Sequence, residues 1–210
     1  MSAPAPGLIA ALNRRLRRLP VWPLWVLGLL PGLWTFWLAL HGALGPDPVR
    51  AFELALGRWA LKFLVASLAV TPLLRLTGIG LMRFRRALGL IAFVYVVAHL
   101  AVWLFIDVRD VALVWRDILR RPYITIGMAA FALMVPLAVT SSATMIARLG
   151  AARWRALHRL VYVITPLAAV HFVMVRKGWQ IEPLAWLAAI VLLLALRLLP
   201  RRRRRLRPTS

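Results

Sequence analysis

The chain has 210 residues, of which 62% are hydrophobic, and it contains no cysteine. So much apolar surface is better satisfied by lipid than by a soluble core, so we expect a membrane protein that crosses the bilayer several times. Without cysteine, disulfides, thiolate-ligated heme and iron–sulfur clusters are excluded. The net charge of +22 resembles that of nucleic-acid-binding proteins. Because these charges lie between hydrophobic stretches, we set that class aside.

Six apolar segments follow one another, each long enough or nearly long enough to cross a bilayer as a helix. They cover residues 21–40, 56–74, 87–106, 123–140, 156–175 and 184–199. The first follows a basic stretch but is longer than a signal-peptide core, so we expect it to be retained. The predicted fold is all-α: a six-helix transmembrane bundle over 21–199, with a basic N-terminus at 1–20 and a basic tail at 200–210.

The charges divide between the two sides of this layout. If the N-terminus is cytoplasmic, most of the 28 basic residues fall in the cytoplasmic segments, and all six acidic residues fall outside. The positive-inside rule predicts this bias for an even number of spans. We therefore expect both chain ends in the cytoplasm and a chain that crosses the membrane six times.

Histidines inside the apolar segments are the strongest functional signal, because a membrane interior disfavours an ionisable ring. His99 lies 13 residues after Arg86, and His171 lies 13 residues after His158. At ~1.5 Å per residue, both rise ~20 Å from the cytoplasmic side. Two imidazoles at one depth can hold a heme iron between them. The fourth histidine, His41, ends the first segment and is interpreted as interfacial.

His158 lies near the cytoplasmic end of its segment, where Arg85 and Arg86 occupy the facing position of the third segment. Arginines there suit a phosphate or carboxylate, such as that of a flavin mononucleotide (FMN). At the outer end of the second segment, Arg58 and Lys62 are one helical turn apart. They are candidates to meet heme propionates, with simple snorkelling to the interface as an equal alternative.

Several short stretches resemble one family, the heme-binding membrane subunits of bacterial protein-methionine-sulfoxide reductase systems (the MsrQ family, formerly YedZ), within the ferric-reductase-like transmembrane group. The resemblance covers about residues 20–200, and it implies multi-pass insertion in the bacterial inner membrane. It rests on HGALGPDPV (41–49), GRWALKFL (57–64), TPLL (71–74), RRALGL (85–90), His99–Leu100, RPYITIG (121–127), TSS (140–142), RWRALHRLVY (153–162) and His171.

The resemblance implies heme b and FMN as cofactors, with the heme histidines carried onto His99, His158 and His171 as iron ligands. It implies electrons from a cytoplasmic NAD(P)H-dependent flavin reductase, passed to a periplasmic molybdopterin subunit that reduces methionine sulfoxide in oxidised envelope proteins. Related ferric reductases use two histidines on each of two helices. This chain departs from that pattern beside Arg85 and Arg86, so one outer heme with flavin on the inner side fits better.

We therefore expect an electron-transfer subunit of an oxidoreductase system rather than the sulfoxide-reducing subunit. The partner is expected on the outer connections 41–55, 107–122 and 176–183. Two alternatives stay open. One is a stand-alone ferric or quinone-linked transmembrane reductase, and the other is a transporter whose histidines relay protons.

Overall fold

The computed structural model describes residues 6–176 and 180–198, and within these ranges it contains helices and no strand. The predicted basic tail at 200–210 lies outside the described residues. The longer helices are α1 (Pro6–Arg18), α2 (Trp22–Leu40), α3 (Pro48–Thr77), α4 (Arg85–Val102), α5 (Val111–Arg120), α6 (Pro122–Val139), α9 (Val161–Val175) and α10 (Ile181–Leu198). Short ones are α7 (Ala143–Leu149), α8 (Ala151–Leu157), the 3₁₀ turns η1 (Met82–Phe84) and η3 (His158–Leu160), and the π-helical turn η2 (Trp103–Val108).

Six helical stretches among the described residues are long and apolar enough to span a membrane, which confirms the predicted number. They are Trp22–Leu40, Pro48–Thr77, Met82–Val108, Pro122–Val139, Ala151–Val175 and Ile181–Leu198. Many large apolar side chains on α2 and α10 are exposed, among them Leu27, Trp34 and Leu192. Such surfaces are stable against lipid and costly against water, so the chain is a multi-pass membrane protein.

The second span begins at Pro48, whereas the sequence had predicted residue 56. Asp47 caps the helix, since its Oδ1 accepts a hydrogen bond from the Arg50 amide at 3.0 Å. Pro48 occupies the first turn, where its missing N–H costs nothing. The helix therefore runs for 30 residues, and Arg58 lies well inside it rather than at its end.

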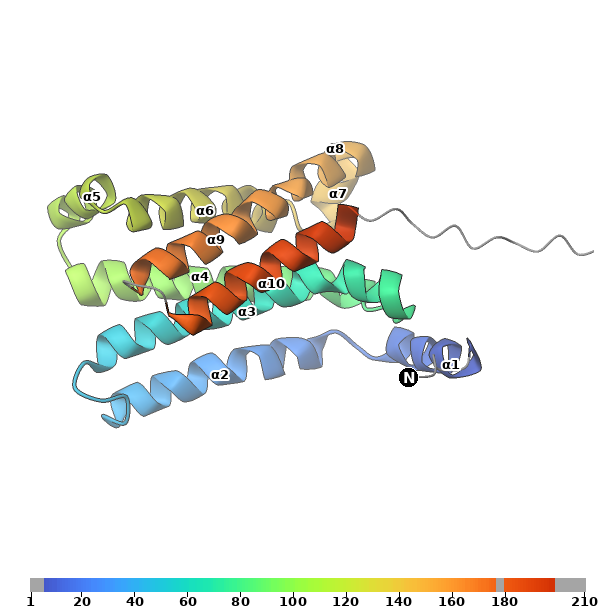
Figure 1. Ribbon diagram of the computed structural model, residues 1–210, viewed down its shortest axis with the longest axis horizontal. Helices are drawn as coiled ribbons and strands as arrows, with labels where there is room; N and C mark the ends of the chain where they lie inside the picture. Colours follow the sequence, from blue (N-terminus) through green and yellow to red (C-terminus); the bar gives the residue numbers. More distant parts are fainter. Residues whose placement is uncertain (1–5, 177–179, 199–210) are drawn as a thin grey trace, which may run out of the picture.

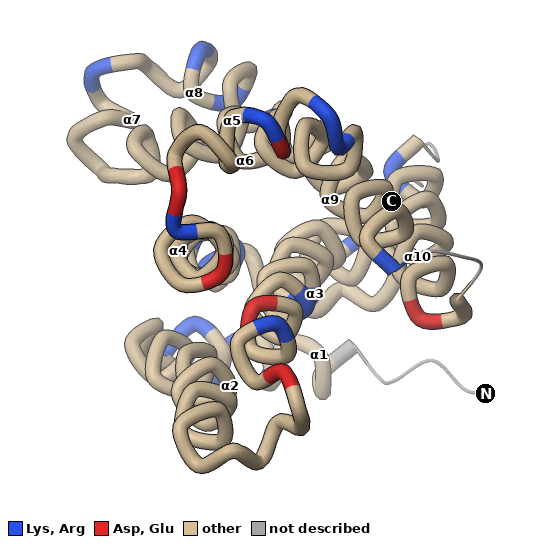
Figure 2. Tube along the Cα trace, turned by 90° about the vertical axis from the view of Figure 1, so that its left-hand side faces the viewer, with Lys and Arg blue, Asp and Glu red and all other residues tan. Residues whose placement is uncertain are grey.

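The long helices run side by side, and α3 carries the largest set of buried side chains (Figure 1). One end of the bundle holds α1, α7 and the described end of α10, and we call it the termini end. The other holds α5 and the α2–α3 connection, and we call it the α5 end. Figure 2 looks along the bundle from the α5 end, where the acidic residues gather.

Prolines open the backbone of two spans, and side chains from neighbouring helices fill the gaps. Beside Pro31 of α2, the Tyr95 hydroxyl accepts a hydrogen bond from the Gly32 amide and donates one to the Gly28 carbonyl, both at 2.8 Å. In α3, Pro72 has no N–H for the Leu68 carbonyl, and Arg197 of α10 donates to that carbonyl at 2.5 Å. These contacts fix α2 and α10 against the central helices, because unpaired backbone groups are costly in lipid.

Candidate functional site

A cavity of about 390 Å³ lies between α3, α4, α6 and α9 towards the α5 end, and both His99 and His171 line it. We call it the histidine cavity. Its walls are largely apolar, and its mouth carries charged groups. Leu61, Val96, Met128, Phe131 and Phe172 are among the wall residues. A mostly apolar cavity of this size with a few convergent polar groups is typical of a cofactor site.

Each of the two histidines donates a hydrogen bond to a backbone carbonyl of a neighbouring helix. His99 on α4 donates from Nδ1 to the carbonyl of Glu53 on α3 at 2.8 Å. His171 on α9 donates from Nδ1 to the carbonyl of Tyr123 on α6 at 2.7 Å. A carbonyl can only accept, so the proton is on Nδ1 and the Nε2 lone pair stays free. Metal-ligating histidines are oriented in this way.

The two rings lie close together across the cavity. Their centres are 6.4 Å apart and their planes cross at 80°. Because they belong to α4 and α9, their separation depends on how these helices pack against α3 and α6. The arrangement offers two imidazole nitrogens to one group placed between the rings.

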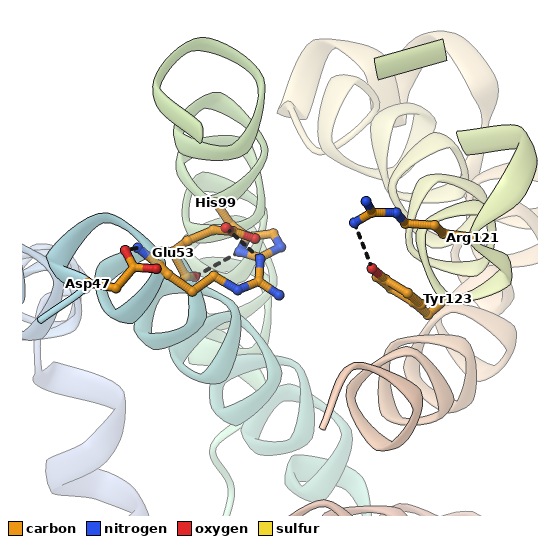
Figure 3. A network of polar contacts seen from close by, with 6 residues as sticks. Asp47, Glu53, His99, Arg121 and Tyr123 are labelled. Carbon is orange, nitrogen blue, oxygen red and sulfur yellow. Dashed lines mark hydrogen bonds and ion pairs between the residues drawn. The ribbon is translucent and has the colours of Figure 1, made fainter. Parts of the chain in front are cut away.

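Charged and polar side chains surround the mouth of the histidine cavity. The nearly buried Glu53 carboxylate accepts from Arg50 at 2.9 Å on one side. On the other, Arg121 pairs with Asp117 at 3.1 Å and donates to the Tyr123 hydroxyl at 3.2 Å. The hydrogen bond to Tyr123 raises the pKa of Arg121, so it stays charged. Figure 3 shows Glu53 and His99 across the cavity from Arg121 and Tyr123.

The two basic residues singled out on the second span take different places. Arg58 lines the histidine cavity, and its Nη1 lies 4.0 Å from the Glu182 carboxylate. The Lys62 ammonium lies over the Trp59 ring, 4.0 Å from its centre. Both residues lie on α3, with Lys62 one turn further from the start of the helix than Arg58.

A second cavity of about 460 Å³ lies towards the termini end, and His158, Arg85 and Arg86 all line it. We call it the arginine cavity, because Arg155 and Arg159 line it as well. The sequence placed the first three of these residues together, and the structure brings them together. Four guanidinium groups around one cavity favour an anionic ligand.

His158 is held differently from the other two histidines. Its ring stacks on Trp154 with centres 4.0 Å apart, and its Nε2 lies 3.2 Å from the Thr140 hydroxyl. That hydroxyl donates its single proton to the Pro136 carbonyl at 2.6 Å, so it accepts from His158 Nε2. The nitrogen that is free in His99 and His171 is therefore engaged in His158.

A thin apolar layer separates the two cavities. Leu64 and Met134 line both, and they pack with Ala92 and Ile164 in one buried cluster. Beside this layer, Phe93 of the arginine cavity stacks on Phe131 of the histidine cavity, with ring centres 6.1 Å apart and planes within 5°. The two sites are close neighbours within one bundle.

Comparison with known proteins decides the family. Residues 56–169 match the family model described as ferric reductase like transmembrane component. The chain belongs to the ferric-reductase-like transmembrane family. A protein from Agrobacterium fabrum named protein-methionine-sulfoxide reductase heme-binding subunit MsrQ is 47% identical over 90% of this chain and 88% of its own length. Proteins of the same name from Brucella ovis and Brucella suis are each 46% identical over 91% of this chain and 90% of theirs. The resemblance to the MsrQ family is thereby confirmed, while no solved structure gave a match.

Sequence reasoning missed part of this site. Arg50, Arg121 and Tyr123 line the histidine cavity, and Gly57 and Gly127 lie against its two histidines. The glycines carried a signal, because a glycine inside a helix costs stability unless packing needs it. The mouth pairs, Arg50 with Glu53 and Arg121 with Asp117, are only three and four residues apart in the chain, but their place beside this cavity depends on the tertiary structure.

Proposed function

We propose that this chain carries electrons across the bacterial inner membrane, using a heme b held by His99 and His171. The observation that supports this most is the pair of carbonyl-anchored imidazoles facing one cavity. The names of the relatives support it too, because each describes a heme-binding subunit.

The residues present fit a heme. A metal–imidazole bond is about 2 Å and a ring nitrogen lies about 1 Å from the ring centre, so one metal sets the two centres roughly 6 Å apart. The 6.4 Å separation agrees with that value. Among the described residues no group of three or more His, Asp or Glu could hold a bare ion. Two protein ligands suffice for a heme iron, because the macrocycle supplies the others. When bound, a heme supplies reversible one-electron transfer.

The mouth of the histidine cavity suits the heme propionates. We propose Arg58 as one contact, because it lines the cavity. Its ion pair with Glu182 is weak, since the two atoms are 4.0 Å apart and both side chains are partly exposed, so the guanidinium is available to a propionate. Arg50 and Arg121 line the same mouth. Lys62 is a second candidate for a propionate contact, but its ammonium would first have to leave the Trp59 ring.

The arginine cavity is our proposed site for FMN. Arg85 and Arg86 would bind its phosphate, and His158 and Trp154 offer flat surfaces beside them. Because His158 Nε2 is engaged by Thr140, we assign His158 to flavin contact rather than to the iron. Measuring FMN affinity by fluorescence quenching tests this. We expect R85Q and R86Q to bind FMN at least tenfold more weakly, and R148Q, an exposed arginine at the same end, to bind as wild type.

The charge distribution supports a direction for the electrons. Basic residues concentrate at the termini end, and the positive-inside rule supports our assignment of this end to the cytoplasm. We propose a cytoplasmic flavin reductase using NAD(P)H as the donor there. The acidic α5 end would then be periplasmic and would dock a molybdopterin-dependent methionine-sulfoxide reductase. We further propose that the reductase docked there repairs oxidised envelope proteins.

The first experiment is a visible spectrum of the purified protein, oxidised and then reduced with dithionite. We expect a sharp α-band in the reduced form. Electron delivery is then tested by oxidation of the reduced protein on adding a molybdopterin sulfoxide reductase and a methionine-sulfoxide protein. A colourless, folded protein would refute the proposal and favour the transporter alternative. Oxidation by ferric chelates or quinones alone would favour the stand-alone reductase.

A further inference from the structure

Two glycines lie against the two histidines of the histidine cavity. Gly57 of α3 is the fourth residue after Glu53, and Gly127 of α6 is the fourth residue after Tyr123. A Cβ on Gly57 would lie 3.3 Å from His99 Nδ1, and a Cβ on Gly127 only 2.8 Å from His171 Nδ1. Each glycine thus adjoins the nitrogen that donates to the carbonyl four residues earlier.

This spacing has a physical reason. In an α-helix the carbonyl of one residue accepts from the amide four residues on, and its second lone pair lies beside that residue's side chain. With glycine there, the second lone pair is open to an imidazole from another helix. A glycine inside a helix also costs stability relative to alanine, so its presence at both positions calls for such a contact.

We propose that Gly57 and Gly127 are positioning residues that set the planes of the two imidazoles and so tune the bound heme. The inference rests on the proposed function, because it concerns the same heme. The glycines allow both Nδ1–H groups to reach their carbonyls, and these bonds hold the rings crossed at 80°. A hydrogen bond from Nδ1 makes the imidazole a more basic ligand, which stabilises ferric iron and lowers the midpoint potential.

The two positions predict effects of different size. At Gly127 the added methyl cannot fit without moving the His171 ring, because 2.8 Å is below any normal carbon–nitrogen contact. At Gly57 the 3.3 Å contact requires a smaller displacement of the His99 ring. Both substitutions weaken the Nδ1 hydrogen bond and turn one ring relative to the other.

The test compares G127A and G57A with wild type by electron paramagnetic resonance of the ferric heme and by potentiometric titration. Crossed imidazole planes give a low-spin signal with an unusually large highest g value. We expect that value to fall and the midpoint potential to rise in both variants, more in G127A. The control is G28A, whose methyl would meet Ile91 Cδ1 at 2.9 Å on the α2–α4 contact. It matches the crowding without touching a histidine, so its spectrum and potential should equal those of wild type.

Unchanged g values and potential in both G127A and G57A would overturn the inference, as would an equal shift in G28A. If G127A loses its heme while G28A keeps a full complement, the inference is supported, because the added methyl group has displaced the His171 ring. The ring planes would then be compared between wild type and G57A, in which the added methyl group makes the less severe contact. A wild-type protein without heme would refute the proposed function itself, so the two failures are distinguishable.

Discussion

His99 and His171 face each other across one cavity, each with its Nδ1 bonded to a carbonyl of a different neighbouring helix. The bonds run to Glu53 on α3 and to Tyr123 on α6, at 2.8 and 2.7 Å. Four helices therefore determine the position of two rings. A group held between these rings would connect the helices that surround it, so we expect its loss to loosen the bundle.

The first prediction separates the three membrane histidines. H99A and H171A should each lose the reduced heme α-band, because each removes one of the two free imidazole nitrogens. H158A should keep the band, since His158 Nε2 is bonded to Thr140. Visible spectra of the purified variants make the measurement, with H41A as the control because His41 is exposed. Loss of the band in H158A would mean a second heme or a different pairing.

The second prediction concerns the ion pair at the mouth of the histidine cavity. The Glu53 side chain is 5% exposed and that of Arg50 38%, with 2.9 Å between them. R50Q should lower the free energy of unfolding by about 1–3 kcal/mol, because a buried acceptor loses its strongest donor. Thermal unfolding in detergent measures this.

The matched comparisons for this ion pair are R50Q/E53Q and E182Q. The double variant should recover much of the stability, because it removes the unpaired charge. Glu182 lies in half-exposed pairs at 3.6 and 4.0 Å, so E182Q should cost at most about 1 kcal/mol. Equal losses in R50Q and E182Q would contradict the prediction.

The third prediction tests the bond from Arg197 to the Leu68 carbonyl. R197L should destabilise the protein by about 1–3 kcal/mol, because the carbonyl left open by Pro72 then has no donor. In a P72A background the alanine N–H can pair with that carbonyl, so the same change should cost less. A double-mutant cycle of unfolding free energies measures the coupling. An equal cost of R197L in both backgrounds would rule out this role for Arg197.

The fourth prediction concerns Tyr95, whose hydroxyl enters the backbone of α2 beside Pro31. Y95F removes the partner of both the Gly32 amide and the Gly28 carbonyl, so we expect a loss of about 1–2 kcal/mol. Thermal unfolding provides the measurement, and Y123F is the control, because the Tyr123 backbone carbonyl still holds His171. If Y95F were no less stable than Y123F, the inserted hydroxyl would contribute nothing to stability.

Helix ends were predicted less well than helix number. The second span starts at Pro48 instead of residue 56 because the Asp47 cap and Pro48 extend it past the apolar segment. A search for apolar segments does not detect capped first turns that contain charged residues such as Arg50 and Glu53. The misplaced start is also why Arg58 and Lys62 were assigned to the end of the helix.

The relation between His158 and His171 also needed the tertiary structure. On an ideal helix, 13 residues leave the two side chains ~140° apart around the axis. In the structure His158 begins a 3₁₀ turn, η3, which winds more tightly than an α-helix. Pro166 follows within α9. His158 lines one cavity and His171 the other, both between the same central helices.

The sequence by itself determined the membrane class, the six spans, the separation of charges and the common depth of His99 and His171. These follow from apolar length and residue spacing, which are local properties of a chain in lipid. Only the tertiary structure decided the crossed ring planes, the carbonyl partners, and the close approach of Gly57 and Gly127 to the two histidines. Each of these depends on which faces of separate helices meet, and that is fixed by side-chain packing between segments distant along the chain.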